Sequence, residues 1–587
     1  MKTYHYMWHM IRYRPVLYLF NSLIWILIAN FPLVPGLIAQ HFFNTLPKEG
    51  HLTPTLWTLI ALLVVTALAQ VVFFLTGGLI DNLHRFTMAS LLQRNMLERI
   101  LERPGARAVP DSPGEAISRF RDDTEQAENA ISWTIDTTGA ALFAIIAIII
   151  LMRVSVVITL FIFLPLVLIV ALVRSMGKRL ERYRRASRHA TGRVTSAIGE
   201  IFSTVQAIQV AAAEPYVIDY FQRLNEQRRS TMLRDSVFSQ LLNSTFANTV
   251  GLGTGFILVL AAQYVHSGKL GIGDLALFIY YLNFAALFTQ WIGTFLAHYA
   301  QTGVAFHRMD KLLQGAPQER LVAHRPLHMS GTIPPLLAPQ RHESDSLYIL
   351  EARNLTYHYP DTGRGIDDID IHIKRHTLTV VTGRIGSGKT TLLEVLLGLL
   401  PKDAGEIYWN GQRVEDPATF FVPPRSAYTA QVPHLFSTTL RENILLGLPE
   451  DETNLQNAVH MAVMERDITG LDNGLDTVIG TRGVKLSGGQ AQRSAAARMF
   501  VRNTELYVFD DLSSALDVET EHILWERLFS ERKNTCLVVS HRRAVLQRAD
   551  HIIVLKDGRV ESEGTLDGLL QRSEELQRLW YREMYEP

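Results

Sequence analysis

The chain has 587 residues, of which 48% are hydrophobic, and its 57 basic side chains balance 57 acidic ones. This length exceeds that of one domain, and the zero net charge gives no reason to expect a nucleic-acid partner. The one cysteine, Cys536, excludes a disulfide framework and a cysteine-based metal site, and its apolar neighbours predict a buried structural residue. Because long apolar runs stop near residue 310, we expect a membrane-embedded first half and a soluble α/β second half.

Six segments of the first half are long and apolar enough to cross a bilayer as helices, which takes about 20 residues each. They lie near residues 15–42, 54–80, 135–152, 155–175, 237–265 and 273–299. Several uncharged runs of this length exclude the buried helices of a large soluble protein. The polar N-terminus and the length of the first run argue against a cleavable signal peptide.

The placement of basic residues predicts the orientation of these spans. Arginine and lysine concentrate between the second and third spans and between the fourth and fifth. The other three connections carry one such residue each, Lys48, Arg153 and Lys269. Both termini and the two long connections are therefore predicted to be cytoplasmic.

Apolar residues recur at helical spacing in both long connections, so we expect the spans to continue as helices beyond the bilayer. Each connection also has a break, at residues 111–120 and 213–221, that suits either a short transverse helix or a solvated turn. A stretch rich in proline, histidine and glycine predicts a linker at 314–346. The expected domains are therefore a transmembrane domain at 1–313 and a soluble α/β domain at 347–587.

The soluble part contains a phosphate-binding loop of the form G-x-x-x-x-G-K-[ST], between an apolar strand and a helix. Backbone N–H groups of such a loop surround a β-phosphate, and the helix N-terminus adds its dipole. Lys389 would reach the β- and γ-phosphate oxygens, and Thr390 would hold Mg²⁺. The residues expected to bind the nucleotide here are Gly383, Arg384, Ile385, Gly386, Ser387, Gly388, Lys389, Thr390 and Thr391.

Two further segments fit the same chemistry. The apolar strand 506–510 ends at Asp510, whose carboxylate can bind the Mg²⁺ that Thr390 also contacts. Between loop and strand, a serine and two glycines precede a helix and make a second anion-binding helix terminus. The members of this segment are Ser487, Gly488, Gly489 and Gln490.

With these motifs the chain resembles, over essentially its whole length, an exporter-type half of an ABC transporter, in which six membrane helices are fused to one ATPase domain. The resemblance implies that Tyr359 stacks on adenine, that Gln431 contacts the metal and the attacking water, and that His541 contacts the γ-phosphate. It also implies that the loop 514–517 crosses to a partner and that the breaks near 114–122 and 213–221 are coupling helices.

The resemblance further implies that the ATPase domains work as head-to-tail pairs. Each ATP then lies between the phosphate loop of one chain and the 487–490 segment of the other. The expected partner is therefore a second half-transporter, and the expected cofactors are ATP and Mg²⁺.

Two positions depart from the family pattern. Asp511 stands where the family has a glutamate general base, and Thr481 stands where many exporters have a glutamate. Aspartate is one methylene shorter, and misplacement of a catalytic group by about 1 Å can slow a positioned reaction by about 10²-fold. We therefore favour a heterodimer in which the phosphate loop, Asp510, Asp511 and His541 form an impaired site. A homodimer in which Asp511 is a slower but real base is the competing hypothesis.

The expected function is ATP-driven export of a lipid, peptide or amphipathic small molecule across a bacterial inner membrane, with the ATPase domain in the cytoplasm. An importer on the same scaffold, for example for siderophores, and a regulatory ATP-binding subunit with little hydrolysis are the alternatives. No intramembrane charge cluster suggests ion coupling. Polar and aromatic residues within the spans either line a cavity or bond neighbouring helices, the commoner role for any one of them. They are Asn30, Gln70, Asn243, Asn248, Asn283, Gln290, Trp291 and His298.

Overall fold

The computed structural model describes residues 1–49, 53–103, 105, 113–266, 270–329, 341–480, 483–512, 516–529 and 534–582. The chain forms two compact units: a helical unit of Met1–Leu97 with Asp111–Leu327, and an α/β unit of Glu98–Pro110 with His328–Pro587.

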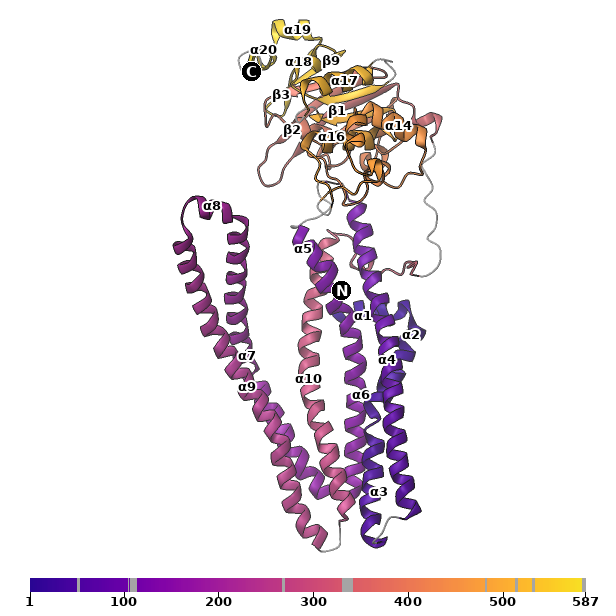
Figure 1. Ribbon diagram of the computed structural model, residues 1–587, viewed down its shortest axis with the longest axis vertical. Coiled ribbons are helices and arrows are strands. Elements are labelled where there is room, and N and C mark those ends of the chain that lie inside the picture. The colour runs from indigo at the N-terminus through magenta and orange to yellow at the C-terminus, as the bar shows by residue number, and fades with distance from the viewer. Residues whose placement is uncertain are drawn as a thin grey trace. The chain divides into compact units, whose positions relative to one another are not determined.

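Long helices dominate the helical unit (Figure 1). In chain order its elements are α1 Thr3–Tyr13, α2 Pro15–Asn30, α3 Leu33–Glu49, α4 Pro54–Leu101, α5 Pro113–Ser118, the π-helical turn η2 Arg119–Asp123, α6 Thr124–Val154, α7 Val156–Ser203, α8 Val205–Val210, α9 Glu214–His266, α10 Ile272–Leu312 and the 3-10 turn η3 Gln318–Val322. In Figure 1, α7 and α9 run side by side and are joined through α8, while α10 packs against α3 and α6.

Five of the six predicted spans each fall within a single helix, and the first is divided between two. Within the described residues, three helical stretches are long and apolar enough to cross a bilayer: Pro15–Leu46, Pro54–Leu101 and Gly114–Val154. The other three predicted spans stay predictions. With 48, 48 and 53 residues, α4, α7 and α9 are about twice the length that a bilayer needs, which confirms the long helical extensions.

The first predicted span is divided between α2 and α3 at Phe31 and Pro32. Proline has no N–H with which to continue the helical ladder, so α2 ends there with the Phe31 N–H bonded to the Ile28 carbonyl.

The structure has a short helix at the first predicted transverse helix but not at the second. The first break contains α5, which begins at Pro113, a residue suited to a first helical turn. The second prediction is wrong in position, because residues 213–221 are the first turns of the 53-residue α9. No proline or glycine follows Pro215 until Gly251, so nothing stops the helix. The separate short helix is α8, and the chain turns after it at Ala212, whose φ is 49°.

The first part of the predicted linker packs against the helical unit. Leu321 and Val322 in η3 are buried. The Asn95 side chain on α4 donates hydrogen bonds to the Leu321 and Ala323 carbonyls at 2.9 and 3.0 Å. Residues 330–340 of the predicted linker lie outside the described part of the chain.

The α/β unit contains an antiparallel sheet of order β2-β1-β4-β5 and a six-stranded sheet of order β10-β9-β3-β8-β7-β6. The strands are β1 Ile349–His358, β2 Gly365–Lys374, β3 Leu378–Gly383, β4 Ala404–Trp409, β5 Gln412–Arg413, β6 Ser426–Thr429, β7 Leu506–Asp510, β8 Thr535–Val539, β9 His551–Lys556 and β10 Arg559–Gly564. The helices and 3-10 turns are η4 Glu343–Asp345, α11 Lys389–Leu396, α12 Pro417–Phe420, α13 Leu440–Leu445, α14 Glu452–Met461, α15 Glu465–Thr469, η5 Gly474–Asp476, α16 Gly488–Phe500, α17 Val518–Phe529, α18 Arg543–Leu546, α19 Leu566–Arg572 and α20 Glu574–Arg582.

The central strands of the six-stranded sheet are apolar because both of their faces are covered. On β3, Val380 belongs to one hydrophobic core and Val381 to another. Cys536 on β8 is buried with a free thiol, as predicted. Since β3, β6, β7 and β8 are parallel, their carboxyl ends meet at one edge of the sheet, where open α/β sheets place their ligands.

Candidate nucleotide-binding site

A cavity of about 810 Å³ lies at this carboxyl edge. It brings together the ends of β3, β7 and β8, the first turn of α11 and loops that follow β6 and β8. Its lining residues are Gly383, Arg384, Ile385, Gly386, Lys389, Thr390, Gln431, Asp510, Asp511, Val539, His541, Arg542 and Leu579.

The phosphate loop depends on glycine at Gly383, where the chain leaves β3. Its φ of 147° is one that other residues rarely adopt, and a Cβ atom there would lie 2.2 Å from the Leu555 carbonyl oxygen. Gly388, with φ 99°, ends the loop and caps α11. The backbone therefore turns back over the start of the helix, in the form that cradles phosphate.

The Lys389 side chain is held over the phosphate loop by hydrogen bonds to the backbone of the loop. Its Nζ donates hydrogen bonds to the Gly383 and Arg384 carbonyl oxygens, both at 2.8 Å. Burial lowers the pKa of Lys389, since desolvation disfavours the charged form. An anionic phosphate in the cavity would offset that desolvation.

Asp510 and Thr390 provide oxygen atoms suited to a hard cation. Burial raises the pKa of the Asp510 carboxyl, and the neighbouring Thr390 side chain partly offsets this effect. Asp510 Oδ2 is buried without a hydrogen-bond partner in the described structure. The described residues contain no group of three or more His, Cys, Asp and Glu side chains that could enclose a metal ion. The donor set fits Mg²⁺, which takes few protein oxygens and completes its shell with water and phosphate.

Asp511 follows β7 directly and faces the same cavity. Its φ is 51°, and its N–H donates to the Val539 carbonyl at 3.1 Å, which ties it to β8. Gln431 Nε2 lies 3.4 Å from Asp511 Oδ2, and Asp511 Oδ1 is buried without a partner among the described residues. His541, beyond β8, lines the cavity as well. The structure thus groups Gln431, Asp511 and His541, the predicted catalytic side chains, beside the phosphate loop.

Several predicted residues lie outside the cavity lining. The Tyr359 ring is partly exposed and reaches the first turn of α11, where its hydroxyl is 3.4 Å from Thr391 Oγ1. Ser387 is buried beneath the loop, and its Oγ has no partner among the described residues. Thr481 and residues 514–515 fall outside the described part of the chain.

The 487–490 segment forms the start of α16 as predicted from its serine and glycines. Ser487 Oγ accepts from the Gln490 N–H at 3.2 Å, and Gln490 Oε1 accepts from the Ser487 N–H at 2.9 Å. This reciprocal pair is a capping box, which fixes the helix terminus. None of these residues lines the cavity that holds the phosphate loop.

The C-terminal helix α20 was missed from the sequence. Its Leu579 lines the cavity, and its Glu575 forms an ion pair with Arg384 of the phosphate loop. The Arg543 guanidinium lies 4.8 Å from the centroid of the Trp580 ring. The only signal in the sequence was the helical spacing of apolar residues in 574–582, which does not reveal the docking partner.

Comparisons with known proteins agree with this architecture. The model of the ABC transporter transmembrane region matches residues 16–291, and the model described as ABC transporter matches residues 366–514. Together the two models match well over half of the chain.

Two curated relatives match at similar levels. The chain is 27% identical over 436 residues to the probable multidrug resistance ABC transporter ATP-binding/permease protein YheI of Bacillus subtilis (strain 168), covering 72% of this chain and 69% of that protein. It is 26% identical over 490 residues to the ATP-dependent lipid A-core flippase of Escherichia coli (strain K12), covering 82% of this chain and 80% of that protein.

The fold is shared with a solved structure of a bacterial Atm1-family ABC exporter with ATP bound. The TM-score is 0.75 at 18% sequence identity, with 96% of this chain and 98% of that chain covered. The chain has a helical transmembrane domain followed by a P-loop ATPase domain, and the two family models match in the same order. The chain therefore belongs to the ABC transporters as an exporter-type half-transporter.

Proposed function

We propose that this chain is one half of a dimeric exporter that moves a lipid, peptide or amphipathic small molecule across a bacterial inner membrane by alternating access. The observation that carries the proposal is the division of the phosphate-binding elements. The cavity contains the phosphate loop, Asp510, Asp511 and His541, whereas the capped 487–490 segment lies outside its lining. One chain therefore contributes to two composite sites and completes neither.

Exposed apolar side chains around α8 support a partner contact. Phe202, Val210 and Tyr216 have exposed fractions of 76%, 90% and 71%. Large exposed apolar patches of this kind mark interaction surfaces in proteins. A second half-transporter that covers the α7–α9 pair would bury them.

Each cavity residue has a role that follows from its position. Lys389 neutralises the phosphates that the loop binds, and Thr390 with Asp510 would hold Mg²⁺, which neutralises developing charge at the phosphoryl group. Asp511 orients and polarises the attacking water, Gln431 positions both the water and the Asp511 carboxylate, and His541 contacts the γ-phosphate.

The transport cycle follows from these roles. Two bound ATP molecules hold the ATPase domains of the dimer together, the coupling helices transmit closure, and the membrane helices open outward. Hydrolysis and phosphate release restore the inward state. Such coupling requires that ATP and its products favour different conformations.

We infer that the site built on this chain's own phosphate loop turns over slowly. Asp511 stands at the position of the general base and lies within reach of Gln431. Because its carboxylate is shorter than glutamate by one methylene, the attacking water is held less well. The intact 487–490 segment fits a partner whose own phosphate loop forms the productive site. A homodimer with a slower Asp511 base is the second candidate.

The purified, reconstituted full-length chain tests this division. Alone it should bind ATP tightly, hydrolyse it slowly, and lose little of that rate in Asp511→Asn. A Lys389→Ala variant controls for ATP binding. Vigorous ATPase activity that Asp511→Asn abolishes would overturn the impaired-site account and establish the homodimer.

Vectorial transport separates the rival functions. ATP-dependent uptake of a labelled amphipathic compound into inverted vesicles supports export, and uptake only into right-side-out vesicles supports an importer. Tight ATP binding with neither form of uptake supports a regulatory subunit.

A further inference from the structure

A second cavity, of about 250 Å³, lies inside the helical unit among α2, α6 and α10. Its volume is just below the roughly 300–1,000 Å³ of drug-sized ligand sites. Aromatic and aliphatic side chains form the lining except for one carboxylate. The lining residues are Trp25, Ile28, Ala29, Pro32, Asp136, Ala140, Phe143, Phe284 and Trp291.

The cavity has two chemically distinct ends. The antiparallel helices α6 and α10 meet at two levels: the Trp133 and Trp291 rings are 5.1 Å apart, and the Phe143 and Phe284 rings are 5.4 Å apart. Given the rise of an α-helix, the two levels are separated by about 15 Å along α6 and about 10 Å along α10. Asp136 lies near the tryptophan level, so that end is acidic and aromatic, and the phenylalanine end is apolar.

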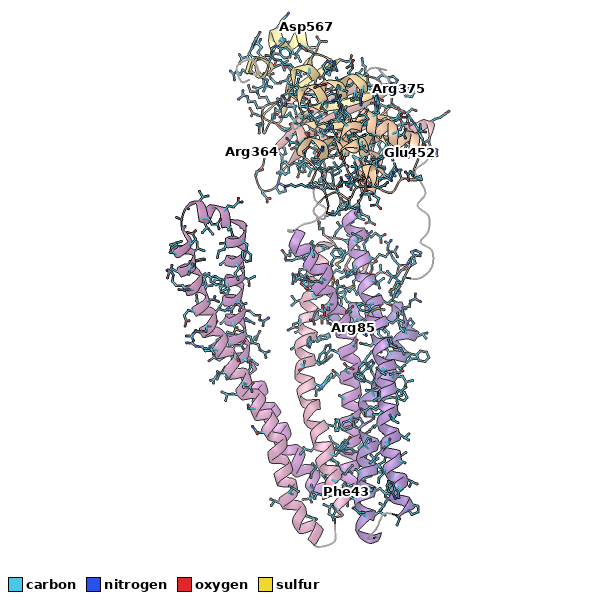
Figure 2. The ribbon with its side chains drawn as sticks, viewed as in Figure 1. Phe43, Arg85, Arg364, Arg375, Glu452 and Asp567 are labelled. Atoms are coloured by element: carbon cyan, nitrogen blue, oxygen red, sulfur yellow. The ribbon has the colours of Figure 1, made fainter. Side chains whose placement is uncertain are left out.

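Asp136 differs from other acidic residues of the helical unit. Glu128 pairs with Arg85 at 3.0 Å, within the bundle where Figure 2 labels Arg85, and Asp123 pairs with Arg308 at 3.3 Å. In the described part of the chain, the Asp136 carboxylate makes neither an ion pair nor a hydrogen bond. An ionisable group at membrane depth is costly without a partner and generally marks a functional position.

The surroundings of Asp136 increase the negative potential. Asp81 on α4 interacts electrostatically with Asp136. Asp81 accepts hydrogen bonds from Asn21 at 2.9 Å and Ser132 at 2.7 Å. Neither carboxylate is paired with a lysine or arginine among the described residues. This acidic pair was not recognised in the sequence, because Asp81 and Asp136 lie on different helices that are far apart along the chain.

The depth of Asp136 suits the head group of an amphipathic molecule. It lies 18 residues before the end of α6 at Val154, a distance of about 27 Å. Since the hydrocarbon core is about 30 Å thick, and α6 is predicted to run outward from the cytoplasm, Asp136 lies close to the cytoplasmic boundary. The phenylalanine level then lies near the middle of the bilayer.

We propose that this cavity binds an amphipathic organic cation, with its positive group between Asp136 and the Trp25 and Trp291 rings and its apolar body toward Phe143 and Phe284. The proposal deepens the proposed export function by naming its cargo class. A quaternary or protonated amine would neutralise the negative charge of Asp136 and interact with the tryptophan rings. An anionic cargo would meet two carboxylates instead.

Tetraphenylphosphonium binding to the full-length chain in nanodiscs, without nucleotide, tests the site. We expect saturable binding that Asp136→Asn weakens by about tenfold or more, while Asp136→Glu keeps it within about threefold. Glu181→Gln, which removes an exposed carboxylate on α7, is the matched control and should bind normally. Tetraphenylborate, with the same shape and the opposite charge, should show no saturable binding when it is titrated separately.

Three results would each overturn the proposal: no saturable binding to the wild-type chain, equal binding by Asp136→Asn, or equal saturable binding of tetraphenylborate alone. Misfolding of Asp136→Asn leaves the Asp136→Glu and tetraphenylborate comparisons decisive. Because binding is measured without ATP, the test does not depend on export. Loss of ATP-driven uptake with intact phosphonium binding contradicts the proposed function, and uptake of other compounds without phosphonium binding contradicts the cavity assignment alone.

Discussion

Arg384 of the phosphate loop and Glu575 of the C-terminal helix form a two-pronged ion pair. The Arg384 Nε and Nη2 atoms each donate to a different oxygen of Glu575, whose side chain is only 2% exposed. The same helix contacts Arg543, two residues after His541, through the backbone and ring of Trp580. One terminal helix thus holds loops on two sides of the nucleotide cavity.

We predict that Glu575→Gln weakens ATP binding by about threefold to tenfold, because a charge-assisted pair becomes a neutral hydrogen bond and the phosphate loop is held less firmly. The ATPase rate at saturating ATP should change less than the affinity. Titration of the full-length chain with a fluorescent ATP analogue measures the effect. Asp567→Asn on the neighbouring α19 (Figure 2) removes an exposed carboxylate and serves as the control. An unchanged Kd in Glu575→Gln would contradict this role of α20.

The phosphate loop allows a comparison of two glycines. Gly383→Ala places a Cβ atom 2.2 Å from the Leu555 carbonyl and should abolish ATP binding by displacing the loop. Gly386→Ala meets no atom within 4 Å and introduces only the strain of a positive φ, about 1 kcal/mol. ATP binding should therefore survive in Gly386→Ala, and equal loss in both variants would show that the close approach at Gly383 is not the determinant.

Because the Asp510 carboxyl is buried, we predict that the stability of the folded chain depends on pH. Burial raises its pKa above the unfolded value of about 3.9. Protonated Asp510 therefore favours the folded chain below that value, and this contribution is lost as the pH rises through the folded pKa. Without nucleotide, the Tm of Asp510→Asn relative to wild type should increase over this window and then level off.

Thermal melts of the detergent-solubilised chain across this pH range measure the difference. A Tm difference independent of pH would rule out the proposed cost of burying the Asp510 charge. Addition of Mg²⁺ and ATP should stabilise the wild type and have little effect on the variant.

Substitution of the α16 capping box can distinguish a loss of helix stability from a loss of function at the 487–490 segment. Ser487→Ala removes a cap of about 1 kcal/mol and should reduce the ATPase of the assembled dimer while ATP binding in this chain's own cavity is unchanged. Thr439→Ala removes a capping box of the same chemistry from α13 and controls for stability alone. If both variants lower the ATPase equally, Ser487 acts only as a helix cap.

The features that were predictable from sequence are those encoded by neighbouring residues. The phosphate loop is a contiguous motif between a strand and a helix, and the transmembrane segments are contiguous apolar runs. The position of α8 was mispredicted because Glu214 and Pro215 signal the start of a helix without indicating its length. The Arg384–Glu575 pair joins residues 191 positions apart, which local patterns do not specify.

The separation of the phosphate loop from the 487–490 segment has a genetic consequence. If the transporter is a homodimer, a copy with Lys389→Ala and a copy with Ser487→Arg rebuild one undamaged site between them, so co-expression should restore part of the transport that each loses alone. If the partner is a different half-transporter, two copies of this chain never meet in one complex, and no such rescue occurs. Complementation between alleles would then reveal the subunit composition in living cells, before any protein is purified.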